Sequence, residues 1–574
     1  IIYVIAASIG FSSCTGLFGE GQLDMAPVED INEDKIFSDY AMFRQYADQA
    51  YSYMPGHLGR LWNSLVSSMG DESRNKGGCT AIFNNGAWDG TRMDTSNKMV
   101  DANNEISDMW QNMYIGIRKA NKIIENIDRI PNFPSDEIKD RCLGEAYFLR
   151  AFFYFELIKR WGGVPIIDHT LVLNQDNLDL PRDTYEKCVE FIENDCKTAA
   201  GLLPLKYADA DNGRASKGAA LALRSRTLLY AARQLHNPTN DIAKWEKAAK
   251  AAKDVIDLKL YTLYPDYVNM FFQPVCSEII MNRPRIKMNF EQGHTNGSTF
   301  WTRFIATQGY NGWAGEWVTQ NLVDMFEDSK GYPITNSQIY NDEDPYANRD
   351  PRLDMCILRN DRFWYDRKLE FWVTADGKES GRDKGTTHIN VLGYAIAKFW
   401  PETHQRYKGT STYMNYIFFR YADVLLMYAE ASLEAGDKPT AIEYLDMVRT
   451  RGDNMPSIGD TYPQGITENQ LREIIRRDRR IELAFEDKRW WDILRWKICD
   501  GENGVMNKPI GGMKIEDTNG DGVWEYNYHE VGKRTFLPRM YYQPIPQYVI
   551  DKNPVIREQN GGEDGWVNGQ NPGY

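Results

Sequence analysis

A nearly uninterrupted apolar segment most constrains how this chain can fold. The stretch GEAYFLRAFFYFELIKRWGGVPI is apolar on almost every side from Ala146 to Ile158. A helix that is hydrophobic all round has to be covered by other elements. The pair Gly162 and Gly163 favours a helix end at that point. We therefore predict a buried central helix that is surrounded by further helices.

Other segments carry the helical repeat needed to surround it. IFSDYAMFRQYADQAYSYM and ISDMWQNMYIGIRKANKIIENI place apolar residues at the spacing of an amphipathic helix. The pattern recurs between 184 and 258 and between 421 and 497. There, small residues, the turn AGDKP and a second helix from about Pro439 resemble a tetratricopeptide unit of about 34 residues. The expected fold class is mainly α, with tetratricopeptide-like helix pairs.

Long loops separate the helical regions. Helical periodicity fades between about 265 and 415 and again from 500 onward, where Gly, Asn, Asp and aromatic residues dominate. Such loops are uncommon in compact domains unless they carry a function. We expect one domain over 30–574, with a helical scaffold at about 30–260 and 415–500. A variable region with a few short strands fills about 265–415, and the part from 500 to 574 is again rich in loops.

The chain begins with IIYVIAASIGFSSC, an apolar run about half as long as a membrane span of about 20 residues. An apolar run that ends in small residues is typical of a secretory signal, and small residues before a cysteine resemble a bacterial lipobox. We expect residues 1–13 to be a signal peptide truncated at its start. Residues 14–29 would be a tether that begins at a lipidated Cys14. The alternative is an ordinary signal followed by a chance cysteine.

Composition excludes some classes of partner. The chain has 67 Lys and Arg against 81 Asp and Glu, a formal charge of −14, which disfavours nucleic acid as a partner. Its eight cysteines form no CxxC pair and indicate no disulfide scaffold. Aromatic residues make up 13% of the chain, and tryptophans in polar loops favour a flat apolar ligand such as a sugar ring.

Several motifs together resemble the SusD/RagB family of surface lipoproteins from Bacteroidetes. They run in the family's order through the chain after Cys14 and include LDMAPVEDINEDKIFSD, MWQNMYIGIRKANKIIENI, TQNLVDMFEDSKGYP, FFRYADVLLMYAEA, RRDRRIELAFEDKRWWDILRW and YYQPIPQYVIDKNP. The resemblance implies a SusD-like fold without catalysis. It also implies oligosaccharide capture at the outer-membrane surface beside a SusC-like TonB-dependent transporter. The related RagB branch implies peptide capture instead.

Two loops carry the residues that we expect to bind the ligand. NKGGCTAIFNNGAWDGTRMDTSNK resembles, by position, the loop that supplies a stacking aromatic residue in the family; the alternative is a tryptophan packed into the base of its own loop. GHTNGSTFWTRFIATQGYNGWAGEW lies before TQNLVDMFE, where the family tends to place its other stacking residues. We expect stacking by Trp88, Tyr310, Trp313 and Trp301, and polar contacts from Asn85, Asp89, Arg92 and Asn311.

A short acidic motif raises the question of a metal. EDTNGDGVW places Asp517, Asn519 and Asp521 as in the first half of an EF-hand loop, but Tyr528 stands where a bidentate Glu is needed. The sequence leaves open both a structural calcium site and a solvated turn rich in Asp and Asn. No other cofactor is expected.

The stretch RRDRRIELAFEDKRWWDILRWK looks basic, but its charges alternate. Three pairs lie at helical spacing and predict a helix paired within itself rather than one that binds nucleic acid: Arg479 with Glu482, Glu486 with Arg489, and Asp492 with Arg495.

A glycoside hydrolase is the rival class. It needs two carboxylates about 5 to 9.5 Å apart. The acids that stand out fall in helical scaffold motifs: Glu145, Glu156, Glu430 and Glu486. The chain also lacks HExxH and GxSxG. We therefore predict a binding protein and no enzyme.

Overall fold

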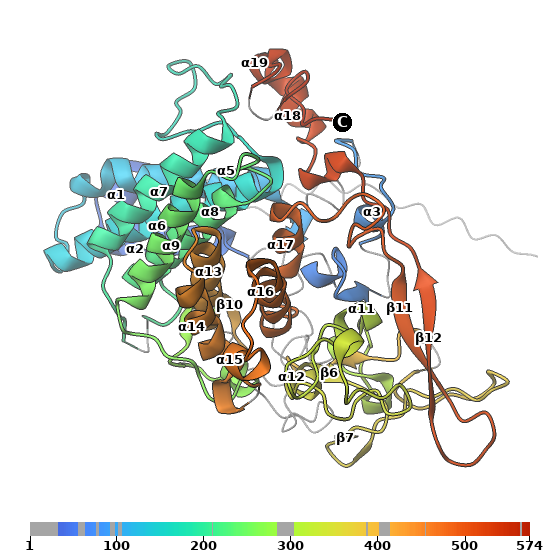
Figure 1. The fold of residues 1–574 in the computed structure, drawn as a ribbon. Coiled ribbons are helices and arrows are strands. Elements are labelled where there is room, and N and C mark those ends of the chain that lie inside the picture. Colours follow the sequence, from blue (N-terminus) through green and yellow to red (C-terminus); the bar gives the residue numbers. More distant parts are fainter. Residues whose placement is uncertain are drawn as a thin grey trace, which may run out of the picture.

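The computed structural model describes residues 33–55, 64–75, 80–91, 98–100, 106–208, 211–283, 304–385, 389–400, 414–453, 455–562 and 565–574. Helices fill the left and centre of Figure 1, and a long hairpin extends on the right. The longer helices are α2 (Tyr40–Ala50), α5 (Met109–Asn126), α6 (Asp136–Trp161), α7 (Tyr185–Leu202), α8 (Lys217–Ala232), α9 (Ile242–Ile256), α13 (Tyr421–Glu434), α14 (Lys438–Arg449) and α16 (Glu468–Glu482). The shorter ones are α1 (Glu33–Phe37), α3 (Ala81–Asn84), α11 (Gln320–Val323), α12 (Arg352–Cys356), α15 (Ile458–Thr461), α17 (Arg489–Arg495), α18 (Gln547–Lys552) and α19 (Pro554–Glu558).

Successive helices pack side by side into one curved layer. Helix α5 packs on α6, α6 on α7, α7 on α8 and α8 on α9, after which α13 covers α9 and pairs with α14. Side-chain caps start most of these helices; for example, Asp108 accepts the Gln111 amide at the start of α5, at 3.0 Å. A cap of this kind satisfies an amide that the helix itself leaves unpaired. The mainly α fold predicted from the sequence is confirmed.

Helix α6 is the predicted central helix. Its residues from Ala146 to Ile158 are all buried except Tyr147, which is half-buried. The helix ends at Trp161, and Gly162 follows with φ of 73°, a left-handed conformation that glycine adopts without steric cost. A Cβ on Gly163 would lie 2.0 Å from the Asp183 carbonyl oxygen. Both glycines are therefore required where the chain leaves the core.

The predicted tetratricopeptide-like pair is present as α13 and α14. Gly436 has φ of 91° in the turn, and the Asp437 side chain accepts the Thr440 amide at 3.2 Å to begin α14. Pro439 lies in the first turn of α14, where its missing N–H costs no hydrogen bond.

The strands of the described residues form six two-stranded antiparallel sheets. They are β1 (Ser73–Asn75) with β5 (Glu316–Val318), β2 (Lys98–Val100) with β3 (Ile106–Asp108), β4 (Ile279–Arg283) with β10 (Tyr416–Arg420), β6 (Ile357–Leu358) with β9 (Ala395–Ile396), β7 (Phe363–Trp364) with β8 (Arg367–Lys368), and β11 (Ile510–Glu516) with β12 (Glu525–Gly532). Most are as short as predicted. The β11–β12 hairpin is longer and projects from the body in Figure 1.

The charges of α16 pair differently from the prediction. Arg495 donates to Asp492 at 2.8 Å, as expected. Arg479 does not pair with Glu482; its guanidinium binds Asp423 at 2.7 Å and Asp492 at 2.8 Å. Helix α16 is therefore tied to α13 rather than paired within itself.

The predicted pair of Glu486 with Arg489 is also wrong. Glu486 binds Arg420 at 2.8 Å and Lys398 at 2.6 Å, while Arg489 binds Asp71 at 2.9 Å. The reason is that α16 ends at Glu482, after which Phe485 and Asp487 have left-handed backbones with φ of 64° and 59°. Helical spacing no longer applies beyond that point.

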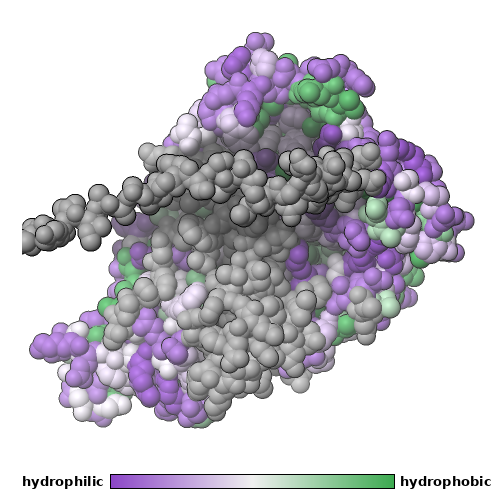
Figure 2. Space-filling view, turned by 180° about the vertical axis from the view of Figure 1, so that it is seen from behind, coloured by the Kyte–Doolittle hydropathy of each residue, from purple (hydrophilic) through white to green (hydrophobic). Residues whose placement is uncertain are grey.

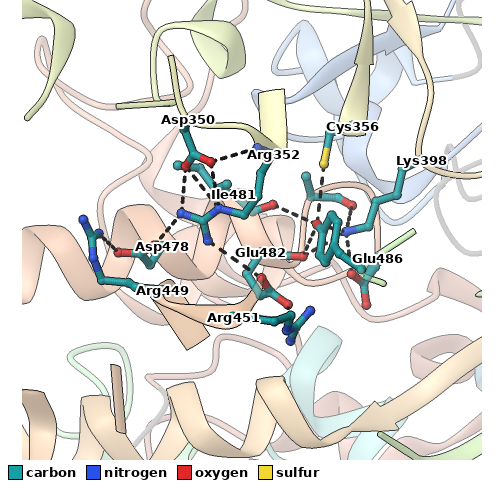
Figure 3. Close-up of polar contacts among 12 residues, drawn as sticks. Asp350, Arg352, Cys356, Lys398, Arg449, Arg451, Asp478, Ile481, Glu482 and Glu486 are labelled. Carbon is teal, nitrogen blue, oxygen red and sulfur yellow. Dashed lines mark hydrogen bonds and ion pairs between the residues drawn. The ribbon is translucent and has the colours of Figure 1, made fainter. Parts of the chain in front are cut away.

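A buried network of ion pairs runs along α16. In Figure 3, Arg352 and Asp478 lie at one end and Lys398 and Glu486 at the other, with Glu482 between them. Arg352 donates to Asp478 at 2.8 Å, and these five side chains are almost completely buried. Replacing a whole buried pair by apolar groups is often neutral, but removing one partner leaves an uncompensated charge. The network therefore specifies how helices and loops fit together.

Hydrophilic residues cover most of the coloured face in Figure 2. Among the described residues, none of the helices combines the length and the apolar character needed to cross a bilayer. Six of the described cysteines are buried: Cys142, Cys188, Cys196, Cys276, Cys356 and Cys499.

Removing one charge from this network tests its role. Glu482 binds Arg420 at 2.7 Å and Arg451 at 3.0 Å. Burial raises the pKa of Glu482, but the neighbouring guanidinium groups outweigh this effect and lower the pKa to about 2. We expect Glu482→Gln to lower the free energy of unfolding in urea by about 3 kcal/mol.

The matched control is Lys253→Gln, which removes a largely solvent-exposed pair with Asp257. This variant is expected to lose less than about 1 kcal/mol. Equal losses in the two variants would contradict a structural role for the buried network.

Candidate functional site

The two predicted binding loops start from the same small sheet. Strand β1 ends at Asn75, which pairs with Glu316 at the start of β5. The Asn75 amide group also donates to the Gly315 carbonyl at 3.3 Å. The loop after β1 and the segment before β5 therefore share one base, although the sequence separates them by more than two hundred residues.

Residues 304–315 form a tightly closed loop. Gly312 N donates to Thr307 O at 2.8 Å, Ala314 N to Ala306 O at 2.9 Å, and Gly315 N to Phe304 O at 2.7 Å. A Cβ on Gly312 would lie 2.0 Å from the Ala306 carbonyl oxygen. Glycine is thus required for the two sides of the loop to approach, and the loop is held by its own backbone.

The buried carboxylate of Asp383 anchors this loop. Asp383 is fully buried and accepts the Thr307 hydroxyl at 2.5 Å and the Glu370 amide at 2.8 Å. Arg367 donates to both of its oxygens, at 2.6 and 2.9 Å. A bidentate pair of this kind defines orientation as well as distance. The loop is therefore fastened to the β7–β8 hairpin.

Tyr310 lies in the core. Its side chain is 5% exposed, its hydroxyl donates to the Trp364 carbonyl at 2.5 Å, and its ring packs edge-on against Trp400 with centroids 5.6 Å apart. The prediction that Tyr310 stacks on a ligand is corrected, because the aromatic residues of the loop region bury it from beneath.

Trp88 is also a core residue. It is 1% exposed and packs edge-on against Phe83 and Trp490, with centroids 4.8 and 6.2 Å apart. Its polar neighbours satisfy local turns, since Asn85 accepts the Ala87 amide at 3.0 Å and Asp89 accepts the Thr91 amide at 2.9 Å. The stacking role predicted for Trp88 is corrected in favour of packing at the base of the loop.

Two predicted residues keep accessible surface on the closed loop. Asn311 is exposed and has a left-handed backbone with φ of 56°. Trp313 is half-buried and packs against the edge of the main core. Their contacts with a ligand stay predictions, as do those of the exposed Asn85 and the half-buried Asp89. Arg92, Trp301 and Cys14 lie outside the described residues.

Two aromatic residues beside this loop were not predicted from the sequence. Phe363 is 64% exposed at the start of the β7–β8 hairpin, and Tyr365 is half-buried at its turn, with its ring 5.3 Å from that of Tyr310. The run FWYDRK was the available signal, because three aromatic residues directly before a turn cannot all face inward. The candidate site comprises Asn311, Trp313, Phe363 and Tyr365.

The acidic motif forms the tip of the β11–β12 hairpin. Asp517 accepts the amides of Gly520, Asp521 and Gly522, at 2.7, 3.1 and 3.0 Å. Asn519 and Asp521 accept further amides of the same turn. The geometry is that of a turn rich in Asp and Asn, and the described residues contain no group of three or more His, Cys, Asp or Glu placed to hold a metal ion.

Glu316 lies beneath both loops. Its Oε1 accepts the Leu65 amide at 2.8 Å and the Ser64 hydroxyl at 2.9 Å, and the side chain is fully buried. Burial raises the pKa of Glu316 to about 7, against the opposing effect of these donors, from an ordinary value of 4.5. Near neutral pH the base of the site therefore holds a proton that the unfolded chain has released.

This proton makes stability depend on pH. The contribution of Glu316 to the free energy of unfolding is full below pH 4.5 and falls by about 3 kcal/mol as pH rises to 7, because in that window this carboxyl is ionised only in the unfolded chain. Glu316→Gln stays neutral, so we expect its unfolding free energy relative to wild type to rise over this range. The control is the exposed Glu379→Gln. If the Glu316→Gln difference is the same at pH 4.5 and 7, the carboxyl is ionised in the fold.

Comparisons with known proteins cover nearly the whole chain. A family model described as "SusD family" matches residues 277–566, and one described as "Starch-binding associating with outer membrane" matches residues 31–229. The SusD-like protein P2 of Formosa agariphila is 28% identical over 442 residues, 73% of this chain and 78% of that protein.

Solved structures agree with this result. The crystal structure of a SusD-like protein from Bacteroides fragilis matches with a TM-score of 0.73 at 27% identity and covers 96% of this chain and 100% of that one. A SusD-like carbohydrate binding protein from the same species matches in fold, with a TM-score of 0.71 at 23% identity over 91% of this chain and 99% of that one.

Proposed function

The chain belongs to the SusD family, and we propose that it captures oligosaccharides at the cell surface and hands them, unaltered, to a SusC-like TonB-dependent transporter. The observation that carries the proposal is the closed loop of residues 304–315. It holds the half-buried Trp313 and the exposed Asn311 in one orientation. An indole face that is positioned before the ligand arrives loses little entropy on binding.

The chemistry of this site suits capture and release. An aromatic contact contributes about 0.5 to 1.5 kcal/mol beyond the area that it buries. Trp313 with Tyr365 and Phe363 would therefore bind a sugar chain with only weak to moderate affinity. Asn311, Asn85 and Asp89 would add hydrogen bonds to hydroxyl groups. A protein that passes its cargo onward has to release it.

Catalysis is disfavoured by where the acids lie. Glu430 binds Arg495 at 2.8 Å and Glu486 binds Arg420, both within the core. Glu145 and Glu156 are buried on α6 and paired with arginines. Carboxylates held in this way are not available as the acid and nucleophile of a glycosidase. Peptide capture of the RagB type uses the same frame and is the second candidate.

The proposed location is the outer membrane, facing the cell exterior. The description of the model that matches residues 31–229 names association with the outer membrane. In this proposal residues 1–13 form the signal, Cys14 carries the lipid, and 14–29 form the tether. Two or three acyl chains on one cysteine would anchor the protein durably, at about 0.8 kcal/mol per buried methylene. The transporter partner follows from the family resemblance.

Calorimetry with a panel of polysaccharides and peptides tests the proposal. We expect binding of at least one polysaccharide with no release of shorter products. Trp313→Ala should weaken this binding about tenfold, because it removes the stacking face.

The matched control is Trp524→Ala, which removes a half-buried tryptophan on the β11–β12 hairpin and should leave the affinity unchanged. Binding of peptides alone would favour peptide capture of the RagB type, and turnover of a panel member would favour an enzyme. Unchanged polysaccharide affinity in Trp313→Ala would remove Trp313 from the site.

A further inference from the structure

A cavity lies on the helical side of the molecule, away from the candidate site. It measures about 940 Å³ and is walled by α7, the ends of α8 and α17, the start of α9, and the segment 538–542 with Pro572. None of its lining residues belongs to the 304–315 loop or the β7–β8 hairpin. Pockets for small organic ligands measure about 300–1,000 Å³, so this cavity is large enough to hold one.

Aromatic rings form one wall of the cavity. Tyr185 and His236 stack with centroids 3.4 Å apart and planes within 3° of parallel. The ring of Tyr542 lies 5.8 Å from His236, and its hydroxyl is 3.3 Å from Nδ1 of that histidine. Burial, with a smaller contribution from Lys244, lowers the pKa of His236 to about 3. The imidazole is thus neutral at pH 7 and suits an apolar ring face.

The charged groups around the cavity are unevenly paired. Those that line it are Glu186, Glu190, Glu193, Lys197, Lys244, Lys247, Lys497 and Arg539. Glu193 binds Lys197 and Lys247, and also Arg224 from behind. Lys244 faces Glu186 at 3.6 Å. Glu190 is exposed to solvent at the rim.

Two cations, Lys497 and Arg539, line the cavity where the end of α17 meets the segment 538–542. Neither has a carboxylate partner in the described part of the chain. Lys497 forms no ion pair there. Arg539 donates to the Gly86 carbonyl at 3.0 Å and to the Trp88 carbonyl, and it hydrogen-bonds the Tyr574 side chain, whose ring centroid lies 5.3 Å from its guanidinium carbon. The two cations lie at the same wall as Tyr542, so positive charge and an aromatic face meet in one place.

We propose that this cavity is a second ligand site, which binds an acidic sugar. The apolar face of the sugar ring would lie against Tyr542 and His236. Its carboxylate would face Lys497 and the guanidinium of Arg539, which accommodates a planar anion. Neutral sugars lack the anion and simple carboxylates lack the ring, so neither uses both features of the wall.

Titrations of the purified full chain with D-glucuronate, D-glucose and propanoate, followed by ligand-observed NMR, test the site. We expect glucuronate to bind about ten times more tightly than either of the other two. Lys497→Asn should weaken glucuronate binding about tenfold. Asparagine tolerates the left-handed backbone of Lys497, with φ of 55°, so the fold should be kept.

Matched variants identify the location. Lys259→Asn changes another exposed lysine with a left-handed backbone, φ of 53°, outside this cavity, and should bind glucuronate as wild type does. Tyr542→Leu should weaken binding independently of charge, while Trp313→Ala should leave it unchanged. The inference is overturned if glucuronate does not bind, if glucose binds equally well, or if Lys497→Asn retains wild-type affinity.

Discussion

Arg420 and the carboxylates around it join the two parts of this fold. Its guanidinium binds Glu278 and Glu482 at 2.7 Å and Glu486 at 2.8 Å, all in the interior. These partners come from the segment before β4, from α16 and from the turn after it. A planar guanidinium with five donors satisfies several carboxylates in one geometry only. The helical layer and the loop region can therefore meet in one register.

Buried polar contacts also join separate elements near the candidate site. Asp383 joins the 304–315 loop to the β7–β8 hairpin through Thr307 and Arg367, and the β1–β5 sheet joins the bases of both binding loops. Buried polar groups of this kind are costly unless every partner is present. These contacts and the backbone hydrogen bonds of the 304–315 loop define one conformation of that loop, in which Asn311 is exposed and Trp313 is half-buried.

Local features of the fold were predictable from the sequence, whereas distant contacts were not. Helix α6 and its end at Gly162, and the turn between α13 and α14, follow from periodicity and capping within a few residues. The partners of Arg479 and Glu486 lie on other elements, so helical spacing gave the wrong pairs.

In the candidate site, too, contacts between distant parts of the chain could not be predicted from local sequence. Trp88 and Tyr310 have polar neighbours in sequence, but Trp490 and Trp400 bury them from far along the chain. Phe363 was overlooked although it stands in the run FWYDRK, because only the position of the hairpin shows which of the three aromatic side chains is exposed. Asn311 and Trp313 kept accessible surface because their loop closes through its own backbone, a local feature that its glycines signal.

A crystal structure of the protein with an oligosaccharide selected by binding would show whether the 304–315 loop contacts the ligand as proposed. We predict electron density for an intact sugar chain whose ring lies against the Trp313 indole, with Asn311 within hydrogen-bonding distance of its hydroxyl groups. The ion pairs around Arg420 should be unchanged. A cleaved sugar, or a chain bound with Trp313 and its loop untouched, would contradict the claim that this rigid loop captures glycan without altering it.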